Sequence, residues 1–353
     1  MEVKIIMDKQ FLMDLLNTSS PSGMEKEVQL LWMDFMKKYA DKVESDNVGN
    51  VYAILNPEAE FKIMIAAHGD EIGFMVKRID SNGFLFLEKL GGISPKVAVG
   101  MKIRFMGKRE VIGVVGANAE HHGGVKDGLT IDDIYVDCGF KNKEEALNFV
   151  NIGDLAVYKR ETELLQNNKI SGKALDNKTG SFIIGEVIKN LSKEKLDVGV
   201  YAVNTSTEET NQIGAHFAAS KIMPNMAIAC DVTFSTDYPG VDTSAHGEFS
   251  LDSGPVLAKG ALINDHINTG LEKSAKELGI KLQYELTPRR TGTDADTIAF
   301  SGTGIPVALV SLPLRYMHSP VETASFKDME DEINLLTHFI LNLNSDFNLD
   351  PLK

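Results

Sequence analysis

Two adjacent glutamates, Glu208 and Glu209, stand between a strand and a helix in the stretch VGVYAVNTSTEETNQIGAHFAAS, residues 198–220. The apolar run before them predicts a strand that ends at Thr207, and small apolar residues at helical spacing follow the pair. Successive strand side chains point to opposite faces, so a solvated pair of carboxylates has no reason to occupy this position. The pattern is typical either of a helix N-terminus, where negative charge is favourable, or of a site where the carboxylates do chemistry.

Side chains of the same kinds follow other apolar runs of the chain. In open α/β sheets, functional sites gather at the carboxyl ends of the strands. His68, Asp70, Asp231 and His318 are placed in this way, and Asp176 stands just before a helical segment. Imidazoles and carboxylates from separate elements suit a metal centre, because carboxylates can bridge two cations. The whole set indicates a metal site more specifically than any one member does.

Each residue of the set also has a structural interpretation. His68 alone could be a hydrogen-bonded core histidine, Asp176 could cap the helix that follows, and Asp231 could open a turn. Other conspicuous residues are interpreted as structural: His121 and His122 as loop residues that could line a cleft, His246 as a turn residue, and Cys230 as a buried strand residue.

The composition excludes several classes of function. The 353 residues carry 36 Lys plus Arg against 50 Asp plus Glu, and a net charge of −14 argues against nucleic-acid or anionic membrane partners. Only Cys138 and Cys230 are present, which fits a reducing compartment and predicts a cytoplasmic protein. The amphipathic residues 1–17 contain no signal-peptide core, and no apolar run is long enough to span a membrane.

The spacing of apolar residues predicts two domains. Residues 1–70 and 160–353 alternate between helix and strand patterns, as in a layered α/β domain whose later strands need not all be parallel. It opens with two helices, the second capped by Ser22 with Glu25 three residues on. Residues 71–159 have short Val, Ile and Phe runs that glycines interrupt, and only one segment, NKEEALNFV, has a helical pattern. This texture predicts an inserted β-rich domain.

Six ordered motifs resemble those of the tetrahedral, or TET, aminopeptidases, the group that includes glutamyl and deblocking aminopeptidases. The motifs are AAHGDEIGFMVKRI, ALDNKTG, EETNQIGA, DVTFSTDYPG, TGTDADTIA and LPLRYMHSPVE, and the match extends from about residue 18 to the last helix. The resemblance implies a three-layer, zinc-peptidase-like α/β catalytic domain interrupted by a β-barrel-like (PDZ-like) domain. It also implies that this second domain builds dimers, which associate into a hollow, tetrahedral dodecamer.

The resemblance implies roles for individual residues around two divalent metal ions, with zinc first and cobalt or manganese as alternatives. Asp176 matches the bridging ligand, and Glu208 matches the general base. The remaining ligands are His68 and Asp231 for one metal, and Glu209 and His318 for the other. We expect Asp70 to orient the His68 imidazole through its other ring nitrogen.

The expected reaction is hydrolysis of the first peptide bond by a water that two metals about 3.5–4 Å apart activate. Arg290, Thr293 and Asp294 would lie beside the substrate pocket, where the guanidinium of Arg290, or of its neighbour Arg289, could select an acidic first residue. The alternatives are a metal-dependent deacylase or polysaccharide hydrolase on the same scaffold, and a non-catalytic assembly protein.

The chain departs from the family pattern beside the site. Thr210 and Asn211 replace an apolar residue and a glycine, Phe234 stands where histidine is common, and RRTGTDA replaces a more glycine-rich approach to Asp294. None of these changes removes a predicted ligand. They leave the preferred N-terminal residue open.

Overall fold

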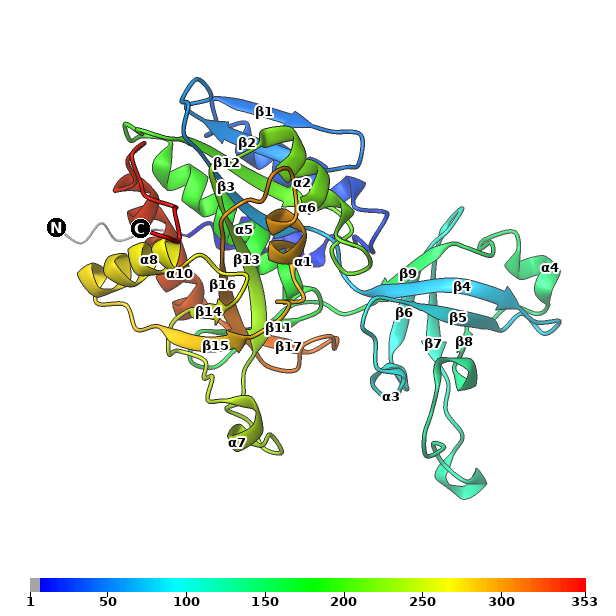
Figure 1. The fold of residues 1–353 in the computed structure, drawn as a ribbon. Helices are drawn as coiled ribbons and strands as arrows, with labels where there is room; N and C mark the ends of the chain where they lie inside the picture. Colours follow the sequence, from blue (N-terminus) through cyan, green and yellow to red (C-terminus); the bar gives the residue numbers. More distant parts are fainter. Residues whose placement is uncertain (1–6) are drawn as a thin grey trace.

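An α/β part and a β-barrel lie side by side in the computed structural model, which describes residues 7–353 (Figure 1). The predicted amphipathic start begins at residue 1, and its first six residues lie outside the described residues; helix α1 spans Lys9–Asn17. Between residues 7 and 353, no helix is long and apolar enough to cross a membrane.

The α/β part is built on a mixed sheet of eight strands in the order β1-β2-β12-β3-β13-β16-β14-β15. Its four central strands are parallel, and β2 and β14 pair antiparallel with this centre, so the later strands are not all parallel, as the sequence pattern allowed. The strands are β1 Lys42–Ser45, β2 Val51–Leu55, β3 Lys62–His68, β12 Gly199–Thr205, β13 Met226–Phe234, β14 Val256–Gly260, β15 Gln283–Thr287 and β16 Val307–Leu314. A small second sheet consists of β10 Glu163–Leu165, β11 Lys169–Gly172 and β17 Glu322–Ser325.

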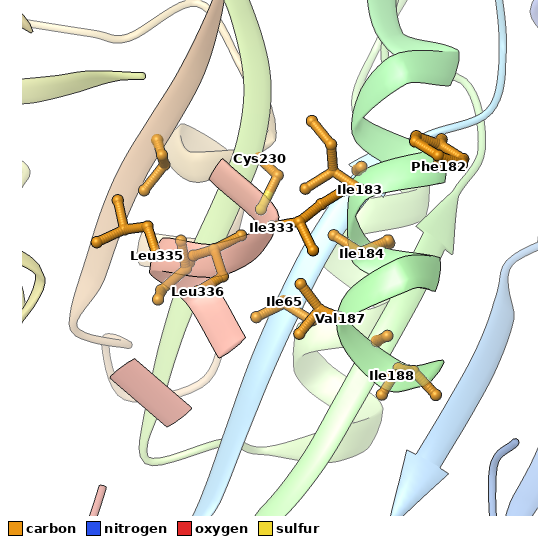
Figure 2. Close-up of a cluster of buried hydrophobic side chains, with 14 of the residues drawn as sticks. Ile65, Phe182, Ile183, Ile184, Val187, Ile188, Cys230, Ile333, Leu335 and Leu336 are labelled. Carbon is orange, nitrogen blue, oxygen red and sulfur yellow. The ribbon is translucent and has the colours of Figure 1, made fainter. Parts of the chain in front are cut away.

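Helices cover both faces of the large sheet, as the predicted three-layer architecture requires. Alternate residues of β3 enter two separate cores: Ile63 and Ile65 pack in one, and Met64 and Ala66 in the other. The first face is covered by α1, α2 Lys26–Met36, α5 Leu175–Leu191, α8 Asp265–Leu278 and α10 Phe326–Leu341, and the second by α6 Ile213–Ile222 and α9 Asp294–Ala299. Figure 2 shows side chains of α5 and α10 packed with Ile65 of β3 in the first core.

The inserted segment forms a closed barrel in the order β4-β5-β8-β7-β6-β9 with a hydrophobic core of its own. The strands are β4 Gly73–Ile79, β5 Leu85–Leu90, β6 Lys102–Met106, β7 Glu110–Val115, β8 Tyr135–Asp137 and β9 Leu155–Tyr158. One helix was expected here, but two short ones occur, α3 Pro95–Ala98 and α4 Lys143–Ala146, beside the 3₁₀ turns Glu120–His122 and Ile131–Asp133. Pro95 begins α3, because proline is tolerated at the first helical position, and so short a helix has no periodicity to detect.

Three local expectations are wrong. Ser22 does not cap α2, because the helix begins four residues later with Glu25 at the N-cap position; the Ser22 hydroxyl instead contacts that of Thr210. Strand β12 ends at Thr205, two residues before the expected Thr207. His246 ends a four-residue helix, α7 Thr243–His246, which its preceding Asp242 caps.

Candidate metal centre

The predicted ligands lie at one edge of the large sheet because β12, β3, β13 and β16 are parallel neighbours. His68 is the last residue of β3, and Glu209 lies in the turn after β12. His318 follows β16, and Asp176 lies in the first turn of α5. Asp231 does not open a turn, since β13 continues to Phe234, and its side chain reaches the site from within the strand.

The five side chains form two groups that share one carboxylate. In the first group, Nε2 of His68 lies 3.2 Å from Oδ1 of Asp176 and 3.8 Å from Oδ1 of Asp231. In the second, Nε2 of His318 lies 3.2 Å from Oδ2 of Asp176 and 3.5 Å from Oε2 of Glu209. Each oxygen of Asp176 therefore faces a different imidazole.

The chemistry of this cluster fits divalent cations. Burial raises the pKa values of Glu209 and Asp231 well above the ordinary range, and the negative charge of Asp176 adds to the effect. Burial also acts to raise the pKa of Asp176, but hydrogen bonds with the His318 and His68 rings outweigh it and hold that pKa low. The buried Oε1 atom of Glu209 has no hydrogen-bond partner within residues 7–353. Two cations would neutralise the crowded carboxylates and give this oxygen a partner.

Glu208 lies beside both groups but belongs to neither. Its Oε2 atom is 3.7 Å from Nε2 of His68, and its Oε1 accepts a hydrogen bond of 2.9 Å from Nε2 of Gln212. Burial raises the pKa of Glu208, which the nearby His68 partly offsets. Thr207 has a φ of 55°, so the backbone leaves the extended conformation just before the pair, and both glutamates line the same cavity.

Asp70 contacts the His68 ring and also other parts of the site. Its Oδ1 atom lies 3.4 Å from Nδ1 of His68, and its backbone oxygen lies 3.2 Å from the same nitrogen. The same carboxylate accepts the backbone N–H groups of Glu208 at 3.0 Å and Glu209 at 3.2 Å. Asp70 thus ties the strand that carries His68 to the turn that carries both glutamates.

A second buried carboxylate, Glu322, makes the same kind of contact on the other side of the site. Its Oε1 atom accepts the backbone N–H of His318 at 2.8 Å, and its Oε2 accepts that of Asp176 at 3.2 Å. No pattern in the sequence points to this role. The one feature of the sequence that could have drawn attention to Glu322 is its position in the motif LPLRYMHSPVE, four residues after His318.

A cavity of about 650 Å³ opens over the cluster. Besides the metal-site side chains, its lining includes Thr210, Asn211, Phe234, Glu285, Arg290 and Thr293. Phe234 is 65% exposed and, with Glu285, also lines a neighbouring cavity of about 900 Å³.

The predicted substrate residues are not all in this lining. Arg290 and Thr293 are, whereas the exposed Arg289 is not. Asp294 lies behind the lining, only 2% exposed, where its carboxylate accepts a hydrogen bond from the Thr205 hydroxyl. Burial, with the charge of Glu208 as the next cause, raises the pKa of Asp294 to about 8.

The other histidines lie apart from the cluster. His121 and His122 are exposed on a 3₁₀ turn of the barrel, and His246 lines the neighbouring cavity. Cys230 is buried in β13, as expected. Within residues 7–353, the two groups around Asp176 are the clusters of side chains found that could hold a metal ion.

Comparisons with known proteins agree on one family. The family model described as M42 glutamyl aminopeptidase matches residues 49–335. The lysyl aminopeptidase of Pyrococcus furiosus is 34% identical over 340 residues, which cover 94% of this chain and 96% of that protein.

Two solved structures share the fold across nearly the whole chain. A TET aminopeptidase from a marine sediment archaeon of the Thaumarchaeota has a TM-score of 0.90 at 28% identity, covering 96% of this chain and 97% of that one. The Pyrococcus horikoshii TET1 peptidase, described as able to assemble into a tetrahedron or a large octahedral shell, has a TM-score of 0.84 at 28% identity, covering 95% and 99%.

Proposed function

The chain belongs to the M42 family of aminopeptidases, and from this premise we propose that it releases N-terminal residues from peptides with two divalent cations and Glu208 as general base. The family membership confirms the TET resemblance of the six motifs and makes the protein a peptidase. The number of cations and the roles of individual residues are the proposal.

The observation that carries the proposal is the position of Asp176 between two histidines, with one carboxylate oxygen 3.2 Å from each Nε2. His68 and Asp231 would complete the set for one ion, and Glu209 and His318 the set for the other. Zinc suits these imidazole and carboxylate ligands, with cobalt or manganese as alternatives. Two such cations would polarise the scissile carbonyl and lower the pKa of the attacking water.

Glu208 would carry the proton during the reaction. Gln212 holds Oε1, so Oε2 is the oxygen on the side of the metal ligands. Its carboxylate takes a proton from the water as the water oxygen attacks the carbonyl carbon. It then gives that proton to the leaving nitrogen as the carbon–nitrogen bond breaks. Asp70 acts through others, because it holds the backbone of Glu208 and Glu209 and lies against the His68 ring.

A panel of substrates tests this function against its alternatives. Metal-stripped protein reloaded with zinc, cobalt or manganese would be assayed on amino-acid anilides, acylated amino acids and glucan. We expect hydrolysis of the amino-acid anilides alone. Among them, only those with a free amino group should be cleaved. Hydrolysis of acylated amino acids or glucan in preference to the anilides would favour the deacylase or the polysaccharide hydrolase.

We predict a preference for an acidic first residue, because the exposed guanidinium of Arg290 lines the cavity and can form paired hydrogen bonds with a carboxylate. Glu285 in the same lining would disfavour an acidic side chain while it is ionised, but burial raises its pKa, which favours the neutral form. Arg290→Gln should lower kcat/KM for glutamyl anilide about 10–100-fold, the value of a charge-assisted hydrogen bond, and leave leucyl anilide unchanged.

Arg289→Gln is the matched control, since Arg289 is adjacent, exposed and outside the cavity lining. It should retain the wild-type ratio of glutamyl to leucyl turnover. If the wild-type protein cleaves glutamyl and aspartyl anilides no better than leucyl anilide, the predicted specificity is wrong.

We also propose that residues 71–159 act as an assembly domain that forms dimers, which combine into a tetrahedral dodecamer. The barrel has its own core and exposes apolar side chains on its outside, among them Met75, Ile112 and Val114. Light scattering at micromolar concentration with metal present should show a mass near twelve chains. A monomer alone would reject the assembly, and a stable dimer would support its first step and reject the dodecamer.

A cytoplasmic location is the remaining part of the proposal. Cys138 in the barrel and Cys230 in β13 are both free thiols. Free thiols are typical of proteins from reducing compartments.

A further inference from the structure

Glu322 lies at the meeting point of two segments that are far apart in the sequence. It is the first residue of β17, which pairs antiparallel with β11 so that Glu322 lies opposite Gly172. Strand β11 leads into the turn of Asp176, and β17 follows the turn of His318. The carboxylate is 1% exposed and accepts one backbone N–H from each turn, at 3.2 Å from Asp176 and 2.8 Å from His318.

The backbone of His318 has an unusual conformation at this contact. His318 has a φ of 59°, in the left-handed region that residues other than glycine rarely adopt. Such a conformation persists where the surroundings impose it. The hydrogen bond from the His318 N–H to Glu322 holds the backbone of this turn, and the Gly92 carbonyl, 3.2 Å from Nδ1, holds the imidazole itself.

The two buried carboxylates divide the site between them. Asp70 accepts the N–H groups of Glu208 and Glu209, and Glu322 accepts those of Asp176 and His318. Neither belongs to a group of candidate metal ligands. A carboxyl group that accepts one N–H donor at each oxygen sets the spacing of the two chain segments that donate them.

We propose that Glu322 is a positioning residue of the metal centre, which holds the shared carboxylate of Asp176 and the imidazole of His318 at the separation that binding a cation requires. This inference rests on the proposed two-cation function. In this inference, Glu322 holds the backbone of Asp176 and His318 as Asp70 holds the backbone of Glu208 and Glu209. Its loss should affect first the ion held by Asp176, Glu209 and His318.

Glu322→Gln is the direct test. A carboxamide has one acceptor oxygen, and its NH2 group would face the second backbone N–H instead of accepting from it. We expect the affinity for the cation of the group Asp176, Glu209 and His318 to fall about 10–100-fold, as when other residues that orient metal ligands are lost. Competition with a chelator at equilibrium measures this affinity without an activity assay. Added metal should restore much of kcat, since the ligands themselves remain.

Glu332→Gln is the matched control, because Glu332 is also fully buried, on α10, and within residues 7–353 neither of its oxygens has a hydrogen-bond partner. It should bind cations as the wild type does. Glu322→Asp keeps both carboxyl oxygens, so it should weaken binding less than Glu322→Gln. It also serves as the test variant if the glutamine variant does not fold.

The inference is overturned if the Glu322 variants hold both ions with wild-type affinity, or if Glu332→Gln weakens binding equally. This outcome is distinct from failure of the proposed function. A wild-type chain that binds fewer than two ions, or hydrolyses no peptide with both bound, would reject that function before any variant is compared.

Discussion

Asp176→Asn is expected to hold neither cation and to have no measurable peptidase activity. The two oxygens of Asp176 face different histidines, so both groups of ligands depend on this one carboxylate. An asparagine has one acceptor oxygen, and its NH2 group would point at an imidazole or a cation. The loss should exceed the roughly 10–100-fold drop in affinity caused by losing a residue that only orients a ligand. Elemental analysis of the dialysed variant and a turnover assay measure both effects.

Glu186→Gln is a suitable control for this experiment. Glu186 is a buried carboxylate on the same helix, α5, and Lys189 contacts both of its oxygens at 2.9 Å. It should retain both cations and wild-type turnover. If Asp176→Asn still binds two cations per chain, Asp176 is not the shared ligand.

Strand patterns in the sequence predicted that several of the candidate ligands lie close together. His68, Asp231 and His318 each follow or end an apolar run, and the strands that carry or precede them, β3, β13 and β16, are parallel neighbours in the sheet. The carboxyl ends of parallel strands share one edge, so the position of these side chains at the ends of predicted strands indicated that they gather there. The glutamate pair could be placed near them in the same way, although the strand ends two residues before the expected Thr207.

Contacts between distant segments were not predictable from the sequence. Glu322 and Asp176 are 146 positions apart, and a side chain that accepts a backbone N–H leaves no periodic pattern. The contacts of Asp70 with the backbone of Glu208 and Glu209 were not predicted, for the same reason. The cis peptide bond between Asp176 and Asn177 likewise has no proline to mark it.

The departures from the family pattern at Thr210 and Asn211 have a local explanation. The Asn211 side chain accepts hydrogen bonds from the Thr207 hydroxyl at 3.1 Å and from the Ile213 N–H at 3.0 Å. The Thr210 hydroxyl contacts that of Ser22 at 2.9 Å. Both residues therefore stabilise the turn that carries the glutamates, and their position in the cavity lining keeps a role in specificity open to test.

Glu208→Gln is expected to lower turnover by about 10²–10⁴-fold, the usual contribution of a positioned general base, while both cations stay bound. Glu208 belongs to neither ligand group, so a neutral amide at this position removes the proton acceptor and leaves the ligands in place. Glu209→Gln should behave differently. Its Oε2 is 3.5 Å from Nε2 of His318 within a ligand group, so this variant should lose affinity for one cation.

Metal content and turnover measured on the same preparations of the wild-type, Glu208→Gln and Glu209→Gln proteins test the division of work in the glutamate pair. We predict two ions per chain in the wild type and in Glu208→Gln, with activity lost from the latter, and a selective loss of one ion from Glu209→Gln. Equal loss of metal from both variants, or an active Glu208→Gln protein that retains both ions, would contradict the assignment of Glu208 as base and Glu209 as ligand.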